Sequence, residues 1–267
     1  MNQDKYVLVT GASGGMGYAA ARALAGEGYK VIGLDICGCS DKDGIRMIEA
    51  DITSEDSVIR AIEKVREITD SLYAILHFAG IYMLDSLVEM SGDRVKKIYD
   101  VNLFGAIRIN RIFLPMLSAG SRIVITTSEL APLDPLPFTG IYAITKAALD
   151  KYAYSLRMEL QLLGISVSVL RPGAVDTGMI VKSVEELDKF IETTSLYSCN
   201  AERFKSIVDS VEARRVPAEK IGRLSAKILK AKNPRQVYSI NRNPLLILLG
   251  VLPRRLQTGI IRLILKK

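Results

Sequence analysis

Residues 5–17 read KYVLVTGASGGMG, an apolar and β-branched run that passes directly into a glycine-rich turn. Residues 17–28 then follow helical periodicity, so the sequence predicts a strand, a tight turn and a helix. Glycines let such a turn approach a pyrophosphate, whose negative charge is attracted by the helix N-terminus. Gly15-x-Gly17-x-x-Ala20 fits the dinucleotide-binding pattern in its Gly/Ala form, and Gly11 adds another tight turn.

The same pattern expects an acidic residue about 20 residues later, where its carboxylate binds a ribose hydroxyl pair. Asp35 ends the second apolar run, residues 30–35 (KVIGLD). A carboxylate at this place repels a 2′-phosphate. The sequence therefore favours NAD over NADP as the cofactor.

The turn also contains Gly11-x-Ser13-x-Gly15, the pattern of a hydrolase nucleophile elbow. A serine hydrolase of this kind needs a later histidine as its base. The sole histidine, His77, falls at the end of a predicted strand. A serine hydrolase is therefore a remote alternative.

Outward from the turn, continuous apolar runs alternate with helical patterns, which indicates a parallel sheet covered on both faces. The predicted strands are residues 5–10, 30–35, 45–50, 73–77, 122–127, 166–171 and 236–240. The main helices are expected at 17–28, from a cap at Thr53 or Ser54 to 69, at 94–117 and at 141–163. The predicted fold class is α/β, a single doubly wound Rossmann-type sheet. We expect residues 1–243 to form the catalytic domain, with a flap at 178–216, and residues 244–267 to form an amphipathic tail.

Charge is unevenly distributed along the 267 residues, whose formal net charge is +7. Residues 230–267 contain nine basic side chains, and no acidic residue follows Glu219. The remainder of the chain contains 27 basic and 29 acidic residues, so its charge is nearly balanced. This argues against a general nucleic-acid-binding surface. Cys37, Cys39 and Cys199 lack the spacing of a metal site, so we predict no metal and free thiols in a reducing, cytoplasmic setting.

Tyr142 and Lys146 are four residues apart in the helical run 141–163, so they share one helix face. A phenol has a pKa near 10 and is a poor acid or base at neutral pH. A fixed ammonium one turn away favours the phenolate. The pair therefore predicts a general acid/base in which Lys146 lowers the pKa of Tyr142.

Taken together, the glycine-rich turn and Tyr142-x-x-x-Lys146 resemble the short-chain dehydrogenase/reductase family over residues 5–243. The resemblance implies that Tyr142 exchanges the proton of the substrate hydroxyl, while Ser128 stabilises its oxygen. It also implies that Lys146 binds the nicotinamide ribose and that Asn102 holds a proton-relay water. The implied cofactor contacts are Gly11, Ser13, Gly15, Met16, Gly17, Asp35, Asp51, Ile52, Ala79, Gly80, Tyr142, Lys146, Pro172, Gly173, Val175 and Thr177.

Two positions depart from the family pattern. Its Asn-Asn-Ala-Gly segment is replaced by His77-Phe78-Ala79-Gly80, which leaves the local hydrogen bonds open. Ser128 precedes Tyr142 by 14 residues, one more than usual, so Thr127 is an alternative source of the hydroxyl.

The loops expected around the substrate are apolar: Leu130, Leu133, Leu136, Phe138, Met179, Ile180 and Val181. They predict an apolar primary or secondary alcohol, or its aldehyde or ketone. The tail is similar to those of hydroxysteroid and retinol dehydrogenases, which implies a steroid- or retinoid-like substrate and a role in lipid metabolism. A redox-inactive protein that senses NAD(H) is the alternative from another class.

The apolar run 245–252 is too short to span a bilayer. With the basic helix predicted at 254–267, it resembles a peripheral membrane anchor. The other interpretation is a segment that covers the pocket or packs on a neighbouring subunit, and a homodimer or homotetramer is expected.

Overall fold

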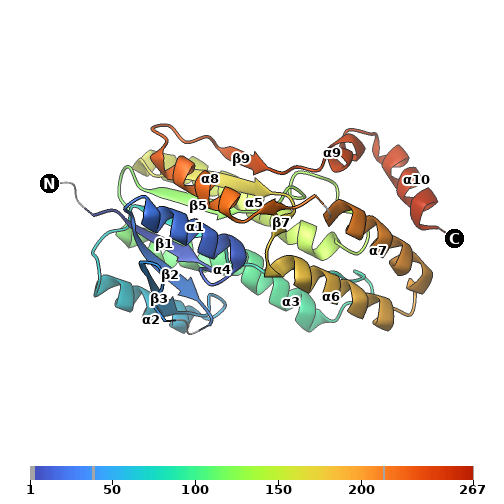
Figure 1. The fold of residues 1–267 in the computed structure, drawn as a ribbon, viewed down its shortest axis with the longest axis horizontal. Coiled ribbons are helices and arrows are strands. Elements are labelled where there is room, and N and C mark those ends of the chain that lie inside the picture. The colour runs from blue at the N-terminus through green and yellow to red at the C-terminus, as the bar shows by residue number, and fades with distance from the viewer. Residues whose placement is uncertain (1–3, 38–39, 213, 267) are drawn as a thin grey trace.

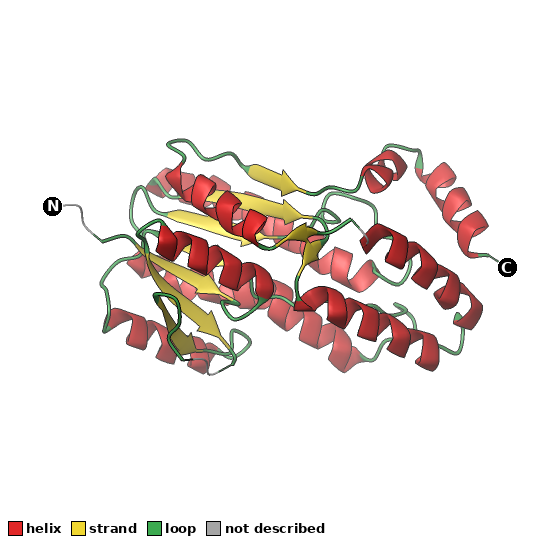
Figure 2. Cartoon of the chain, viewed as in Figure 1, coloured by secondary structure: helices red, strands yellow, loops and turns green. Residues whose placement is uncertain are grey.

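The computed structural model describes residues 4–37, 40–212 and 214–266, and within them seven parallel strands form one sheet. The sheet order is β3-β2-β1-β4-β5-β6-β9, as Figures 1 and 2 show. The strands are β1 (Tyr6–Thr10), β2 (Lys30–Asp35), β3 (Ile45–Glu49), β4 (Ala74–His77), β5 (Arg122–Thr126), β6 (Ser166–Pro172) and β9 (Val237–Ile240). The predicted Rossmann-type class is confirmed. The chain winds outward in both directions from β1 and β4, which leaves a crevice at the carboxyl ends of these central strands.

Helices cover both faces of the sheet because its strands are apolar on both sides. Val7 and Val9 of β1 pack in one cluster with α1 (Gly15–Gly26) and α8 (Glu219–Lys230). Leu8, which points to the opposite face, packs with α2 (Glu55–Arg66) and α4 (Gly105–Phe113). The helix α5 (Gly140–Leu160) packs beside α4 on this second face.

One expected helix start is resolved in detail. Ser54, rather than Thr53, caps α2, and its hydroxyl accepts a hydrogen bond from the Ser57 N–H at 3.3 Å. Glu55 and Asp56 follow in the first turn, where negative side chains stabilise the positive end of the helix dipole.

The single long helix predicted at residues 94–117 is wrong. The segment instead contains α3 (Gly92–Tyr99), a wide π-type turn η1 (Asp100–Phe104), α4, and a short 3₁₀ turn η2 (Leu114–Met116). Pro115 lies in the first positions of η2, where the missing N–H and the ring disfavour a continued α-helix. The wide turn contains Asn102, whose side-chain bonds outside the helix offset the poorer helical geometry.

The region predicted as a flap, residues 178–216, is mostly helical, as the sequence predicts. Two short strands that the sequence does not predict flank its helices. The strands β7 (Val175–Asp176) and β8 (Val216–Pro217) pair in parallel, and between them lie α6 (Gly178–Thr193) and α7 (Ser198–Glu212). The helices α9 (Pro244–Gly250) and α10 (Arg254–Leu265) follow at the end of the molecule opposite the N-terminus (Figure 1). None of the helices in the described ranges is long and apolar enough to cross a bilayer.

Cys37 and Cys199 are exposed free thiols, as predicted. Cys39 lies outside the described residues.

Candidate active site

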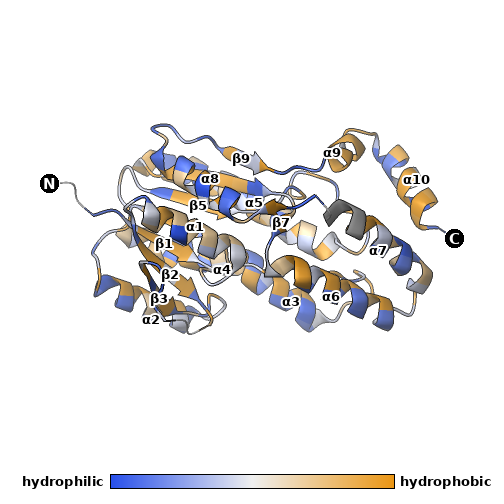
Figure 3. Cartoon of the chain, viewed as in Figure 1, coloured by the Kyte–Doolittle hydropathy of each residue, from blue (hydrophilic) through white to orange (hydrophobic). Residues whose placement is uncertain are grey.

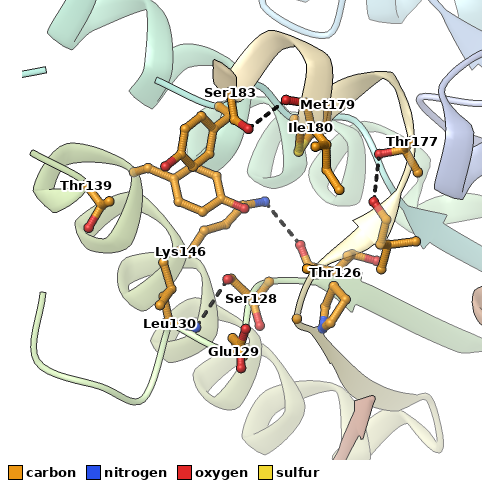
Figure 4. A pocket seen from close by; sticks show the side chains of 18 of the residues that line it. Thr126, Ser128, Glu129, Leu130, Thr139, Lys146, Thr177, Met179, Ile180 and Ser183 are labelled. Atoms are coloured by element: carbon orange, nitrogen blue, oxygen red, sulfur yellow. Dashed lines mark hydrogen bonds between the residues drawn. The ribbon is translucent and has the colours of Figure 1, made fainter. Parts of the chain in front are cut away.

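A cavity of about 210 Å³ opens at the carboxyl ends of β4, β5 and β6, beside the flap helices (Figure 4). It is bounded by strand ends, by α5 and by side chains of α6, α7 and α9. Its lining includes Met16, Phe78, Gly80, Ser128, Glu129, Tyr142, Lys146, Pro172, Gly173, Val175, Thr177, Ile180, Phe204 and Leu246. The fold thus brings Ser128, Tyr142 and Lys146, predicted from three separate positions, to one mostly apolar space.

Ser128 and Tyr142 both line this cavity, and the Ser128 hydroxyl is close enough to the phenol to lower its pKa. Ser128 follows β5 directly, and its Oγ also accepts a hydrogen bond from the Leu130 N–H at 3.2 Å. The Thr127 hydroxyl points elsewhere and donates to Asp150 at 3.3 Å. Ser128 is therefore the hydroxyl that accompanies Tyr142, despite the longer spacing between them.

Lys146 lies one turn after Tyr142 on α5, and its side chain is buried. Its Nζ donates to the Thr126 carbonyl at 3.3 Å and lies 5.7 Å from the centre of the Tyr142 ring. Burial lowers the pKa of Lys146 to about 8 because the apolar surroundings penalise the ammonium.

The pKa of Tyr142 is shifted in the opposite direction to the shift predicted from the sequence. Burial raises the pKa of Tyr142 to about 12, while the hydrogen bond with Ser128 lowers it. The expected lowering by Lys146 is wrong, because the phenol is enclosed by apolar groups. One of these is Tyr82, whose ring centre lies 4.8 Å from that of Tyr142.

Asn102 is almost completely buried in the wide turn η1. Its Oδ1 accepts from the Ile81 N–H at 2.8 Å, and its Nδ2 donates to the Ile81 carbonyl at 3.0 Å and to Thr145 at 3.2 Å. A Cβ added to Gly80 would lie 3.3 Å from both Asn102 Oδ1 and Lys146 Nζ. Asn102 and Lys146 therefore flank Gly80, although only Lys146 lines the cavity.

The glycine-rich turn has the compact form that a dinucleotide cradle needs. A Cβ at Gly11, where φ is +68°, would lie 2.6 Å from the Ala79 nitrogen, and one at Gly17 would lie 2.1 Å from the Gly11 carbonyl oxygen. At the start of α1, Gly14 provides no side-chain cap. The first N–H groups of α1 thus remain available to an anion, so the turn fits a pyrophosphate.

Asp35 lies beside this turn at the end of β2. Its carboxylate accepts hydrogen bonds from the Ser13 N–H at 2.9 Å and the Cys37 N–H at 3.4 Å. The predicted acid is therefore fixed next to the turn.

The other predicted cofactor residues line the same edge of the sheet. Asp51 and Ile52 follow β3, and the Asp51 carboxylate accepts from the Thr53 N–H at 2.8 Å. Pro172, Gly173, Val175 and Thr177 all line the cavity. Ala79 lies behind Gly11, against which its backbone packs.

At residues 77–78, where His-Phe replaces the Asn-Asn of the family pattern, the segment is held by hydrogen bonds to Asn110 and Thr10. His77 is buried and its Nε2 is 2.8 Å from Asn110 Oδ1, while the Phe78 N–H donates to the Thr10 carbonyl at 3.1 Å. Burial lowers the pKa of His77 to about 4, so its ring is neutral at pH 7. Its bond to Asn110 gives no support to a hydrolase built on Ser13.

Four of the seven predicted apolar loop residues line the cavity: Leu130, Leu136, Met179 and Ile180. Leu133 instead packs towards α9, where its Cδ2 is 3.0 Å from the ideal Cβ of Gly250. Phe138 packs against Phe190, Tyr197 and Phe204 in a separate cluster. Val181 is exposed, so these three predictions of lining residues are wrong.

Several lining residues were not predicted from the sequence. Phe204, Ile207 and Val208 reach the cavity from α7, and Leu246 reaches it from α9. Glu129 also lines it, directly after Ser128. Its position next to a candidate catalytic serine could have identified Glu129 as a lining residue from the sequence alone.

Known proteins share the motifs and the fold. A family model described as short chain dehydrogenase matches residues 5–188. NADPH-dependent 1-acyldihydroxyacetone phosphate reductase of Schizosaccharomyces pombe is 32% identical over 183 residues, 66% of this chain and 62% of that protein. Estradiol 17-beta-dehydrogenase 2 of Mus musculus is 32% identical over 194 residues, 66% of this chain and 49% of that protein.

Among solved structures, a short chain dehydrogenase/reductase from Burkholderia phymatum in complex with NAD superposes with a TM-score of 0.76. It is 19% identical, and the match covers 94% of this chain and 93% of that one. This likeness concerns the fold.

Proposed function

Since the chain belongs to the short-chain dehydrogenase/reductase family, we propose that it is an NAD(H)-dependent oxidoreductase acting on an apolar primary or secondary alcohol, or its aldehyde or ketone. One observation carries this proposal. Ser128, Tyr142 and the buried Lys146 line one cavity that is otherwise mostly apolar, and the Ser128 hydroxyl is close enough to the phenol of Tyr142 to lower its pKa. A hydroxyl pair of this kind can hold a substrate oxygen and exchange a proton with it.

The cofactor in this proposal is NAD. The first N–H groups of α1 would hold its pyrophosphate and Asp35 its adenosine ribose, while Asp51 and Ile52 would contact adenine. Ala79, Gly80 and residues 172–177 would contact the nicotinamide half. When bound, the nicotinamide supplies the hydride chemistry that no protein side chain provides. The carboxylate of Asp35 favours NAD over NADP, because it repels a 2′-phosphate.

The proton is handled by the side chains of this chain. In reduction, the Tyr142 hydroxyl donates its proton to the substrate oxygen as the carbon is reduced, and in oxidation Tyr142 takes that proton back. Ser128 donates to the oxygen while negative charge develops on it. With a pKa of about 12, the phenol of the free chain is protonated at pH 7, so its side chain is ready to act in reduction.

Lys146 and Asn102 support this transfer in the proposal. The ammonium of Lys146 would stabilise the phenolate that remains after proton donation, and its Nζ would bind the nicotinamide ribose. Asn102 would hold Ile81 and the wide turn in position beside Gly80 and Lys146, where the relay water would lie.

The substrate in this proposal is steroid- or retinoid-like. The lining from α6 and α7 contributes Met179, Ile180, Phe204, Ile207 and Val208, which favour burial of an apolar body. Estradiol, named in one of the relatives, is a molecule of this class.

Steady-state assays test the activity directly. Steroid, retinoid and aliphatic alcohols and ketones are presented with NAD or NADH, and NADH absorbance is followed. Tyr142→Phe is expected to abolish turnover while NAD binding, measured by fluorescence titration, is retained. Tyr154→Phe, which alters an exposed tyrosine on the same helix, is the matched control. Binding of NAD(H) without turnover across the whole panel would instead favour the redox-inactive sensor.

We also propose that α9 and α10 rest on an anionic membrane surface. Val251 between the two helices and Leu263 on α10 are 73% and 82% exposed, while Ile261 and Leu265 hold α10 against α7. Figure 3 shows that α9 and the last turns of α10 are coloured mostly as hydrophobic. Arg255 and Arg262 on α10 would each contribute about 1 kcal/mol near anionic lipid.

Vesicle flotation tests the membrane contact. The chain is expected to bind vesicles of phosphatidylcholine mixed with phosphatidylserine, less so in high salt, and Leu263→Glu is expected to weaken this binding. Leu162→Glu is the control, because Leu162 is also 82% exposed but precedes the amino end of β6, whereas α9 and α10 follow the carboxyl end of β9. Equal binding by both variants would contradict the proposal.

A homodimer or homotetramer remains part of the proposed function. Exposed apolar side chains on η1 and α5 support it, because they offer a surface that a second copy could cover: Phe104, Ile144, Tyr154 and Met158. Light scattering after size-exclusion chromatography measures the mass of the particle in solution. A monomer at micromolar concentration would contradict the proposed oligomer.

A further inference from the structure

Glu129 is the one carboxylate among the described residues that line the cavity. It follows Ser128 directly in the chain, and only 8% of its surface is exposed. Figure 4 shows it beside Ser128 at the edge of the pocket. An acidic side chain in an apolar cavity is costly unless its oxygens are hydrogen-bonded, so its partners decide what it does there.

Only part of the hydrogen-bonding capacity of Glu129 is used. Its Oε2 accepts from the Asn243 N–H at 2.6 Å, and its own N–H donates to the Pro172 carbonyl at 2.8 Å. Its Oε1 lies over Gly173, 2.8 Å from the ideal position of a Cβ there. Within residues 4–37, 40–208 and 214–266, no group is found that donates to Oε1. One oxygen therefore holds the chain ahead of α9, and the other is left for a molecule in the cavity.

The surroundings of Glu129 favour a donor from that molecule. Burial raises the pKa of Glu129, while the Asn243 N–H and the charge of Arg242 lower it. A buried carboxylate with an unfilled oxygen is stabilised by any hydrogen bond that reaches it, and bonds to charged acceptors are among the stronger ones. The apolar residues that make up most of the cavity wall cannot provide that bond.

We propose that Glu129 selects substrates that carry a hydroxyl or amino group on a carbon neighbouring the reacting carbon. This inference rests on the proposed function, in which Ser128 and Tyr142 hold the reacting oxygen. Because Ser128 and Glu129 are consecutive, with Cα atoms about 3.8 Å apart, a donor close to the reacting carbon is the one that Glu129 can reach. The substrate would then be a largely apolar molecule with two neighbouring polar groups.

Three alcohols that differ only at the neighbouring carbon test this assignment: 2-octanol, 1,2-octanediol and 1-amino-2-octanol. The wild type is expected to oxidise the diol or the amino alcohol with a kcat/KM at least about tenfold above that of 2-octanol, which corresponds to about 1.4 kcal/mol. The diol is neutral and the amine is cationic. Comparing the two therefore shows which donor the carboxylate prefers.

Glu129→Gln is the informative variant, because its amide oxygen can still accept from the Asn243 N–H. Its NH₂ group would then take the place of Oε1, and a donor cannot accept a hydrogen bond from the substrate. The preference is expected to disappear, with kcat/KM for the diol and the amino alcohol falling to about that of 2-octanol. Glu129→Leu removes both oxygens and should also lose the preference.

Glu89→Gln is the matched control, because Glu89 also accepts from a backbone N–H, that of Ser195, but lies outside the cavity lining. It should leave the preference intact, and NAD titration and thermal melting verify that each variant is folded.

The outcomes separate the two proposals. Equal wild-type kcat/KM values for the three alcohols, or an equal loss for all three in Glu129→Gln, would refute the role of Glu129 and leave the oxidoreductase standing. A folded, NAD-binding wild type that turned over none of these alcohols, nor any member of the wider panel, would overturn both.

Discussion

Replacing Lys146 by methionine is expected to stabilise the folded chain while it abolishes the proposed reaction. The ammonium is buried, and its pKa falls from 10.5 to about 8. At about 1.4 kcal/mol per pKa unit, this corresponds to roughly 3 kcal/mol of destabilisation wherever the group is charged in the folded state. Methionine has a similar length, carries no charge and fits apolar surroundings.

A smaller loss opposes this gain. Lys146 Nζ donates to the Thr126 carbonyl at 3.3 Å, and removal of that bond costs about 1 kcal/mol. The net effect at pH 7 is then a stabilisation of roughly 2 kcal/mol, or roughly 5 °C in the melting temperature of a chain of this size.

The stability difference between wild type and Lys146→Met is expected to depend on pH. The folded-state pKa lies below the unfolded value, so between about pH 8 and pH 10.5 the unfolded chain binds more protons and wild-type stability rises with pH. Below about pH 8 the full penalty applies, and above pH 10.5 it is absent. The advantage of Lys146→Met should therefore be largest at neutral pH and shrink on the alkaline side.

Urea unfolding of the cofactor-free chain, followed by circular dichroism from neutral to alkaline pH, measures this difference. Lys151→Met alters an exposed lysine on the same helix and should change stability little. A variant less stable than wild type at pH 7, or an advantage that does not change with pH, would refute the reasoning about the buried ammonium.

Three further predictions concern the cofactor cradle and the wide turn. Asp35→Ser should raise the NADP/NAD ratio of kcat/KM by about tenfold, because a repulsive carboxylate is lost, and an unchanged ratio would contradict its contact with the ribose. Gly17→Ala should weaken NAD binding at least about tenfold in fluorescence titration, because its Cβ would lie 2.1 Å from the Gly11 oxygen. Asn102→Ala should cost about 2–4 kcal/mol in urea unfolding, because the backbone of Ile81 loses both of its hydrogen bonds to the buried Asn102 side chain; a cost below about 1 kcal/mol would argue against this.

Local signals made most of the fold predictable. Continuous apolar runs such as that of β1 identify buried parallel strands, and Ser54 identifies the start of α2 because a cap acts on the next few residues. The glycine-rich turn and Asp35 were likewise readable, since backbone geometry and a fixed spacing determine them.

The features that escaped prediction depend on contacts between distant parts of the chain. The pKa of Tyr142 is set by burial, which the spacing to Lys146 does not reveal. The wide turn is accompanied by hydrogen bonds between Asn102 and Ile81, 21 residues apart. The bond between Glu129 and the Asn243 N–H spans 114 residues. Helical periodicity alone could locate neither of these contacts.

The contact between Gly15 and Thr177 has a consequence for how the two ligands affect each other's binding. A Cβ at Gly15 would lie 2.6 Å from Thr177 Cγ2, so the residue that begins the flap touches the turn where the pyrophosphate would bind. Met179 and Ile180, on the helix that follows, form part of the cavity wall. A dinucleotide that moves Thr177 aside therefore also reshapes the space for the substrate. Occupation of the first site then changes affinity at the second through one shared segment, and by thermodynamic reciprocity the substrate changes cofactor affinity by the same factor.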